Sequence, residues 1–424
     1  MKLWNSTDSV DKLIERFTIG KDNILDLELA KFDVIGSKAH AKMLHSIELL
    51  SADELGGIIS ELDKIKTEFE SGHFAINDGV EDVHSQIEFM LTERLGDVGK
   101  KIHTGRSRND QVLLDLKLYY REKLLEIDQQ LMELIEKFVA KSGEHKEDLM
   151  PGYTHMQIGM ISSFGMWFGS FAEALIDDLR ILRSTAKVID QNPLGSAAGY
   201  GNSFPLDREM TTKLLGFNDL CYNSMYAQFT RGKSELLLAN TLTGICYTLN
   251  KFASDICLYC NQDVNLVKLP TALTTGSSIM PHKKNPDVFE LIRAKTSQLM
   301  SLPNQVMLIC NNLISGYHRD FQQLKELVFP ALATMSDCIL ILTHCITEIE
   351  INKSAIEGDA YNSLYSVEEV NELVQNGMPF REAYLTVKEQ IESGNFHPKK
   401  SISHTHLGSI GNLSLDKILN KLNN

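Results

Sequence analysis

The sequence has little of the residues that interrupt helices. No proline occurs in the first 150 residues, and neither glycine nor proline occurs between Ser107 and Ser142. With 27 glycines and 10 prolines among 424 residues, a collagen-like or low-complexity chain is excluded. Segments in which apolar and polar residues alternate, as they do in half-buried strands, are scarce. We therefore expect a mainly α-helical fold.

Positive charge is in the minority. The chain carries 42 lysines and arginines against 56 aspartates and glutamates, a formal charge of −14. A surface that follows phosphates would be basic overall, so nucleic acid is excluded as a general partner. A local cluster of basic residues remains compatible with one small anionic ligand.

Segments that direct a chain to or through a membrane are also missing. We find no apolar run near the roughly 20 residues of a membrane-spanning helix. The first 17 residues, MKLWNSTDSVDKLIERF, carry charges throughout and do not resemble a signal peptide. The seven cysteines fit buried, reduced thiols, and without a second CxxC pair we expect a structural role for Cys257 and Cys260. These features predict a cytoplasmic protein.

Apolar residues recur at helical spacing in three long segments, residues 107–142, 158–192 and 233–269. Helices of this length are typical of bundles. Apolar residues on more than one face predict that subunits associate. In the first segment the recurring residues are Val112, Leu113, Leu116, Leu124, Ile127, Leu131, Leu134, Ile135 and Phe138.

Composition changes divide the chain into three expected domains. Residues 1–105 form a mainly helical N-terminal domain, and residues 106–358 hold the long helices. Residues 359–424 are shorter and more charged, and we expect a small C-terminal helical domain there.

The segment TTGSSIMPHKKNPD, residues 274–287, predicts an irregular loop between helices, because Gly276 and Pro281 disfavour regular structure. It matches neither a phosphate-binding Walker A loop nor a nucleophile elbow. The basic run 282–284 predicts an anion-binding lid, with a solvated linker as the alternative.

A helix is expected directly after this loop. Asn285 is a candidate N-cap, Pro286 a first-turn proline, and Asp287 an acid favoured by the helix dipole. Backbone N–H groups at such a helix start attract carboxylates or phosphates.

The segment HTGRSRNDQV opens the first long helix. Arg106 and Arg108 flank Ser107, and Asn109 and Asp110 are candidate caps. Arginine can bind a carboxylate through two parallel hydrogen bonds. The alternative is a capped helix start with arginines facing solvent.

Two further polar segments are candidates for the site. Thr154 and His155 follow a Pro-Gly turn in MPGYTHMQ, and histidine is suited to proton transfer near neutral pH. Tyr317, Gln322 and Lys325 occur in SGYHRDFQQLKE, and the last two share a helix face. The alternatives are a structural histidine and a polar surface helix.

Together these segments resemble the argininosuccinate lyase branch of the fumarase/aspartase superfamily. GSSIMPHKKNPD matches the superfamily signature G-S-S-x-M-P-x-K-x-N, while GRSRNDQV and EDVHSQIE have the form of the branch. YTH and Y-x-x-D-x-Q-x-x-K strengthen the assignment, and the resemblance extends from about residue 15 to about residue 412. One departure follows His155, where the apolar IGMISSFG replaces polar residues of the branch.

The resemblance implies three helical domains and a homotetramer whose core contains about twenty helices. It implies active sites that are each built from three subunits. The implied reaction is the reversible β-elimination of argininosuccinate to arginine and fumarate, without a metal or an organic cofactor.

The resemblance also implies individual roles. Ser277 is the base that removes a carbon-bound proton, and His155, paired with Glu290, protonates the leaving nitrogen. Lys283 supplies positive charge near the developing anion. The implied substrate-binding residues are Ser37, His84, Ser107, Arg108, Asn109, Thr154, Asn285, Tyr317, Gln322 and Lys325.

Other functions are compatible with parts of this pattern. A related lyase would act on adenylosuccinate, aspartate or malate, but GRSRNDQ and the Tyr-Gln-Lys set argue against it. A non-catalytic helical scaffold would not need the base, the acid candidate and the lysine together. A serine hydrolase using Ser277 would need a nucleophile elbow, which the sequence lacks.

Overall fold

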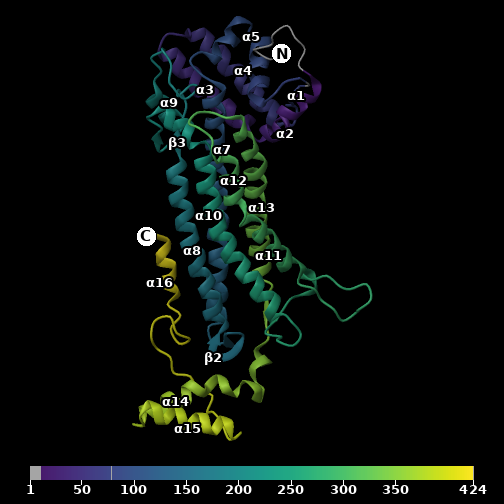
Figure 1. Cartoon of the computed structure of the whole chain (residues 1–424), viewed down its shortest axis with the longest axis vertical. Coiled ribbons are helices and arrows are strands. Elements are labelled where there is room, and N and C mark those ends of the chain that lie inside the picture. The colour runs from purple at the N-terminus through teal and green to yellow at the C-terminus, as the bar shows by residue number, and fades with distance from the viewer. Residues whose placement is uncertain (1–10, 78, 424) are drawn as a thin grey trace. The chain divides into compact units, whose positions relative to one another are not determined.

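The computed structural model describes residues 11–77 and 79–423. Helices dominate this part of the chain, and its strands form three two-stranded pairs (Figure 1). The predicted mainly α fold is confirmed.

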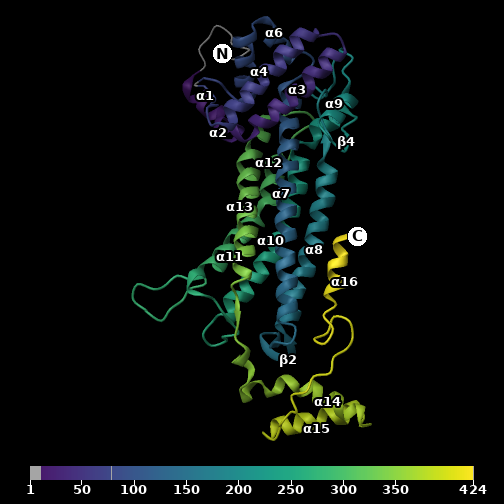
Figure 2. The same ribbon diagram turned by 180° about the vertical axis from the view of Figure 1, so that it is seen from behind.

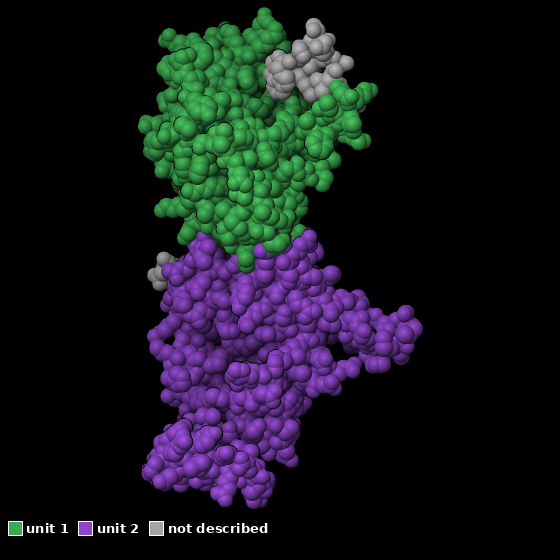
Figure 3. Space-filling view, in the orientation of Figure 1, with its two compact units in different colours: residues 1–127, 182–243, 301–334 green, residues 128–181, 244–300, 335–424 purple. Residues whose placement is uncertain are grey.

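The chain divides into two compact units (Figure 3). Unit 1 contains residues 1–127, 182–243 and 301–334, and unit 2 contains the remaining residues. Four long helices contribute residues to both units: α7 (Arg108–Glu144), α8 (Phe164–Ile189), α10 (Ser224–Tyr259) and α13 (Gln323–Ile346). The division into domains 1–105, 106–358 and 359–424 stays a prediction.

Unit 1 combines the first part of α7 with several short helices. Ser51 begins α4 with a capping box, in which its hydroxyl accepts from the N–H of Glu54 and the Glu54 carboxylate accepts from the N–H of Ser51. Besides its shares of the long helices, the unit contains α1 (Lys12–Ile19), α2 (Asp22–Leu25), η1 (Asp26–Leu29), α3 (Ala30–Ser46), α4 (Ala52–Glu70), α5 (Val83–Leu95), α6 (Asp97–Lys100), η2 (Lys101–His103), β3 (Gln191–Asn192), α9 (Arg208–Leu214), β4 (Asp219–Leu220), α12 (Leu302–Cys310) and η4 (Arg319–Gln322).

Unit 2 contains the later half of α7 and an aromatic core. Trp167 stacks on Phe252 at 5.2 Å between ring centroids, and Phe138 meets Phe252 edge-on at 4.9 Å. Its other elements are β1 (Leu149–Thr154), β2 (Gln157–Ser163), β5 (Val267–Lys268), η3 (Thr271–Leu273), α11 (Asp287–Leu299), β6 (Glu350–Ile351), η5 (Lys353–Ile356), η6 (Asp359–Tyr365), α14 (Ser366–Gln375), α15 (Phe380–Glu392), α16 (Leu415–Asn420) and η7 (Lys421–Asn423).

The helix pair α14 and α15 has a small core of its own. Val370 of α14 packs with Ala383 and Val387 of α15, and all three are buried. Figure 2 shows the two helices side by side, at the bottom of the view.

The first long helix was predicted closely. The glycine- and proline-free segment 107–142 matches α7, which has 37 residues and spans about 55 Å at roughly 1.5 Å per residue. Of its predicted apolar positions, all except Val112 are buried. The 3.6-residue period therefore identified the buried stripe of the helix.

The helix predicted over residues 233–269 differs at both ends. It begins earlier, at Ser224, and ends earlier, at Tyr259. The predicted last residues are not helical, since Asn265 has a left-handed φ of 46° and Val267 belongs to strand β5. Arg231 and Gly232 interrupt it with non-helical angles. Gly232 has φ 85°, and an added Cβ would lie 2.7 Å from the Cys310 sulfur, so both conformation and space favour glycine there.

The prediction of a helix over residues 158–192 was wrong for its first six residues. Residues 158–163 form strand β2, which pairs with β1 in an antiparallel hairpin, and α8 begins only at Phe164. Because the run IGMISS is short and apolar, helical spacing could not be distinguished from strand pairing.

One helical segment has the length and composition of a membrane span, contrary to the sequence prediction. It covers η4 and α13, residues Arg319–Ile346, and half of its most apolar window is buried. Leu324, Leu332 and Leu342 are buried. A buried core helix passes the same test of length and hydropathy, so the feature is weak support for a span.

Candidate active site

Helix α7 begins with a reciprocal cap that differs from the predicted one. Ser107, not Asn109 or Asp110, precedes the first helical residue, and its hydroxyl accepts from the N–H of Asn109 at 3.3 Å. Asp110 accepts in return from the N–H of Ser107 at 2.9 Å. Its second oxygen accepts from the N–H groups of Gly195 and Ala197, so the buried Asp110 ties the glycine-rich loop to the helix start.

The two arginines beside this cap have different environments. Arg106 is buried and donates to the hydroxyl of Ser37 at 2.9 Å. Arg108 retains 18% of its side-chain exposure and donates to Gln111 at 2.9 Å and to Ser85 at 3.1 Å. Arg108 is therefore the arginine with an edge open to a ligand. Ser37 is only 1% exposed, which weighs against direct contact between this serine and a substrate.

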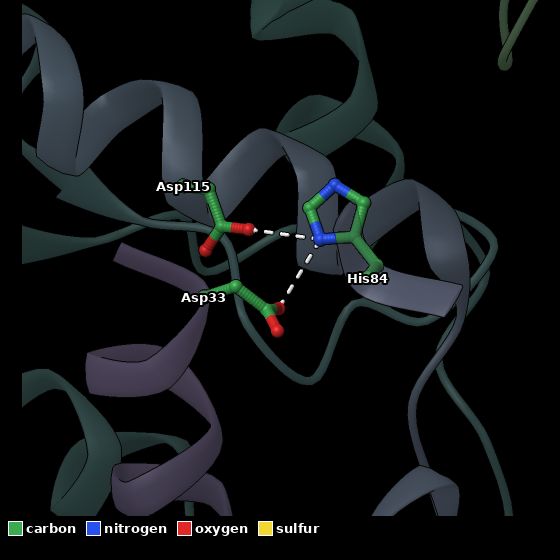
Figure 4. Close-up of side chains that lie close together, drawn as sticks. All are labelled: Asp33, His84 and Asp115. Carbon is green, nitrogen blue, oxygen red and sulfur yellow. Dashed lines mark hydrogen bonds and ion pairs between the residues drawn. The ribbon is translucent and has the colours of Figure 1, made fainter. Parts of the chain in front are cut away.

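His84 lies at the centre of a buried ionic cluster (Figure 4). Its Nδ1 is 3.2 Å from Asp33 Oδ1 and 3.1 Å from Asp115 Oδ2, and the three side chains are at most 1% exposed. The residues come from α5, α3 and α7, so the cluster joins three helices of unit 1. The cluster thus connects α3 and α5 to α7, the helix that carries Arg108.

The electrostatics of the cluster favour a charged histidine. Burial opposes that charge, but the hydrogen bonds to Asp115 and Asp33 outweigh it and raise the pKa of His84 to about 10. Burial also opposes the charge of Asp33, yet His84 lowers the pKa of Asp33 to about 2. Burial and the charge of Asp33 raise the pKa of Asp115 to about 8.

The same three side chains are the candidate metal ligands in the described part of the chain, with their ligand atoms within 4.8 Å of one another. A histidine whose Nδ1 carries a proton cannot ligate a metal through that atom. The cluster therefore suits an ion pair better than a metal site.

A second polar cluster of unit 1 contains Gln322 and Lys325. The amide of Gln322 donates to the carbonyl oxygens of Thr18 and Ile19, and Lys325 lies 2.7 Å from Asp22 and 2.5 Å from Asp26. Both side chains thus face residues 18–26, as their shared helix face predicted. Lys325 is already paired with two carboxylates, whereas Tyr317 is exposed.

In unit 2, Thr154 and His155 lie at the tip of the β1–β2 hairpin. Thr154 pairs with Gln157, and His155 and Met156 form the two-residue turn with φ of 54° and 61°. These left-handed angles are those of a type I′ turn, which side chains other than Gly, Asn and Asp rarely adopt. The conformation presents the His155 ring to solvent at an exposed position.

The signature loop is closed at its base and open at its tip. Thr275 and Asn285 form an antiparallel bridge, with N···O distances of 3.2 and 2.9 Å. Asn285 was predicted as the N-cap of the following helix but is part of this bridge. The observed N-cap of α11 is Pro286. Residues 278–284 are exposed, and Figure 1 shows this loop standing away from the helices of its unit, before α11.

Ser277 lies inside this loop near the bridge. Its Oγ accepts from the backbone N–H groups of Ile279 at 3.3 Å and Met280 at 3.2 Å. Two donors aimed at one hydroxyl oxygen favour negative charge on it. Lys283 is exposed on the same loop. Glu290, one turn into α11, lies 4.0 Å from Arg293.

The predicted site residues are divided between the two units. Unit 1 brings Arg108 together with the His84 cluster and holds Gln322 near Lys325, while unit 2 holds the hairpin tip and the signature loop. Within the described residues, no hydrogen bond or ion pair joins His155 to Ser277 or Glu290. The individual roles therefore stay predictions.

Sequence reasoning missed several polar side chains beside these residues. Each is a charged or amide side chain within an apolar helical pattern. Such a position could have indicated a buried polar group with a specific partner. They are Asp22, Asp26, Asp33, Gln111 and Asp115.

The chain is similar to known proteins over almost its whole length. A family model described as "Lyase" matches residues 5–301. The argininosuccinate lyase of Bacteroides thetaiotaomicron is 55% identical over 417 residues, covering 98% of this chain and 94% of the relative. That of Parabacteroides distasonis is 53% identical, with the same coverage of both chains.

The fold has counterparts among solved structures. The fumarate lyase:delta crystallin of Brucella melitensis superposes with a TM-score of 0.77 at 18% identity, covering 97% of this chain and 94% of that one. At that identity the likeness concerns the fold alone. The family match and the full-length similarity to curated relatives decide the assignment: the chain belongs to the argininosuccinate lyase family.

Proposed function

We propose that the protein cleaves argininosuccinate reversibly to arginine and fumarate, the last step of arginine biosynthesis. The similarity to relatives named argininosuccinate lyase over 98% of the chain supports this function. The reaction breaks a C–N bond, leaves the electron pair on the guanidinium nitrogen and removes a proton from the adjacent carbon. No metal or organic cofactor is part of the proposal.

Ser277 acts in this scheme as the base. A free hydroxyl is too weak to remove a carbon-bound proton, so it needs an environment that stabilises the alkoxide. The N–H groups of Ile279 and Met280 supply two donors, and this is the observation that carries the assignment. Lys283 and Asn285 add positive charge and a polar amide on the same loop.

His155 acts as the acid that protonates the departing nitrogen. A carboxylate partner such as Glu290 would orient the ring and favour the imidazolium. Because His155 lies at an exposed hairpin tip and Ser277 on a protruding loop, we propose that the two meet when segments of different subunits assemble.

Substrate binding is proposed for further polar groups of the chain. Arg108 and Asn109 at the start of α7 suit the carboxylates of the succinyl group, together with Thr154. Tyr317, Gln322 and Lys325 are proposed to line the same pocket. Ser37, Ser107 and His84 contribute by holding the arginines and helices in place.

A homotetramer with a long-helix core is part of the proposal. Unit 1 has a hollow of about 710 Å³ whose lining includes the exposed Phe229, Met307, Leu308 and Ile314. Exposed apolar patches of this kind mark interaction surfaces. The cytoplasmic location is supported by the seven cysteines, all of which are free.

A substrate panel tests the function. Purified protein is mixed separately with argininosuccinate, adenylosuccinate, aspartate and malate, and fumarate release is followed. We expect fumarate and arginine in equal amounts from argininosuccinate and no release from the other three. Fumarate release from one of the other three compounds alone would assign the chain to a different lyase. No release from any of the four would favour a non-catalytic helical scaffold.

A further inference from the structure

Gln111 links the buried ionic cluster to Arg108. It lies three residues after Arg108 on α7, so both side chains are on one helix face, and it is only 2% exposed. Its Nε2 donates to Asp33 Oδ1 at 2.5 Å, and its Oε1 accepts from Arg108 Nη1 at 2.9 Å. One amide thus contacts a carboxylate on one side and a guanidinium on the other.

The chemistry of its two partners fixes the orientation of this amide. An ionised carboxylate only accepts hydrogen bonds and a guanidinium only donates them. An amide between them satisfies both partners in one orientation, with its nitrogen toward Asp33 and its oxygen toward Arg108. The flipped amide would place two donors face to face and two acceptors face to face.

The state of Asp33 decides whether this orientation holds. The imidazole of His84 lies 3.2 Å from the same oxygen that accepts from Gln111, and its charge keeps Asp33 ionised. Arg106, Asp115 and Glu88 are further charged groups near Asp33. The acceptor for the Gln111 amide is therefore built into the packing of α3, α5 and α7.

Arg108 has few other firm contacts. Ser85 accepts from its Nη2 at 3.1 Å, while Asp82 lies 3.5 Å from Nε and Glu88 lies 3.7 Å from Nη2. Among Gln111, Ser85, Asp82 and Glu88, Gln111 is the partner that contacts Nη1 of Arg108. Losing it would release one arm of the guanidinium that remains partly exposed.

We propose that Gln111 is a positioning residue, which fixes the guanidinium of Arg108 for a substrate carboxylate by relaying the orientation set by Asp33. The inference rests on the proposed function, in which Arg108 binds the succinyl group. Gln111 itself does not touch the substrate.

The test is a double-mutant cycle on substrate binding. Gln111→Met keeps the side-chain length and removes both hydrogen bonds, and the affinity for argininosuccinate is measured by calorimetry in the inactive Ser277→Ala background. We expect about a ten-fold loss of affinity, the scale of one hydrogen bond to a charged group. In an Arg108→Met background, Gln111→Met should cause no further loss.

An additive loss in the Arg108→Met background would overturn the proposal, because Gln111 would then act on the fold in general. Unchanged affinity in the Gln111→Met protein would also overturn it. Gln86→Met is the matched control, since Gln86 is a buried glutamine of the same unit whose amide oxygen accepts from the N–H of Asn77. Its affinity should stay within about two-fold.

Two further measurements keep the test independent of folding and of the proposed function. If Gln111→Met fails to fold in a urea titration, Gln111→Asn retains the amide but is too short to bridge Asp33 and Arg108, and it should show the same loss. If the wild type does not cleave argininosuccinate, the proposed function fails. The inference is then decided by a crystal structure of Gln111→Met. A displaced Arg108 guanidinium supports the inference, and an unmoved one overturns it.

Discussion

His84 and Asp33 form a fully buried ion pair, with 3.2 Å between Nδ1 and Oδ1. Removing one partner of a buried pair leaves an uncompensated charge and typically costs about 3–5 kcal/mol. We expect His84→Gln to lower the free energy of unfolding by about that amount, measured by urea titration near neutral pH.

The pair also predicts a pH dependence. The pKa of His84 is raised to about 10, so its stabilisation is complete below the unfolded-state pKa and is lost as the pH rises through about 10. Asp115, with a pKa raised to about 8, acts in the same direction. The free energy of unfolding should fall between about pH 7 and about pH 10, and by less in His84→Gln. His45→Gln is the control, because the ring of His45 hydrogen-bonds to the backbone oxygen of Leu50 and not to a carboxylate. Equal stability of the wild type at both pH values would contradict the charged state.

Lys325 is predicted to stabilise unit 1 through Asp22 and Asp26. Lys325→Met would leave both carboxylates unpaired in a largely buried place and should cost about 3–5 kcal/mol in a urea titration. Lys325→Met combined with Asp26→Asn should recover part of the stability but not the activity. If the single variant is as stable as the wild type, Lys325 does not stabilise unit 1, and its proposed role is limited to substrate binding.

His155→Asn separates the chemistry of the turn from its conformation. Asparagine tolerates the left-handed backbone of a type I′ turn, so the hairpin should persist. Loss of the proton donor should lower kcat by about 10²–10⁴-fold, measured by fumarate release. Met156→Asn makes the same change at the other turn residue and should keep wild-type activity. Activity of His155→Asn within a few-fold of wild type would contradict the acid role.

The long helices could be predicted because their signal is local. Helix α7 has neither a breaker nor a shift in its apolar period over 36 residues, so its length and buried face followed from the pattern alone. The hairpin that carries His155 could not be predicted in this way. Its turn is formed by His155 and Met156, which are not typical turn residues, and its second strand is a short apolar run.

The site was predicted in its components and not in its connections. Ser277 and Arg108 were identified from motifs, but the two backbone donors to Ser277 depend on the loop conformation. Gln111 was missed because its contact to Asp33 requires α3 and α7 to pack together. Such long-range pairing leaves no periodic trace in a single sequence.

The proposed sharing of active sites predicts complementation. His155→Asn and Ser277→Ala proteins, each inactive, are mixed, dissociated and reassembled. A site that takes its histidine from a Ser277→Ala subunit and its serine from a His155→Asn subunit contains both wild-type residues. Part of the fumarate-releasing activity should therefore return. Mixed assemblies that stay inactive would indicate that both residues come from one chain.

The central claim is that Ser277 removes the carbon-bound proton, and fumarate release by Ser277→Ala tests it most directly. Ser278→Ala, the same change at the next residue, is the matched control. We predict that Ser277→Ala loses at least about 10³-fold in kcat while calorimetry shows retained substrate binding, and that Ser278→Ala stays near wild type. Turnover by Ser277→Ala at the wild-type rate would contradict the account.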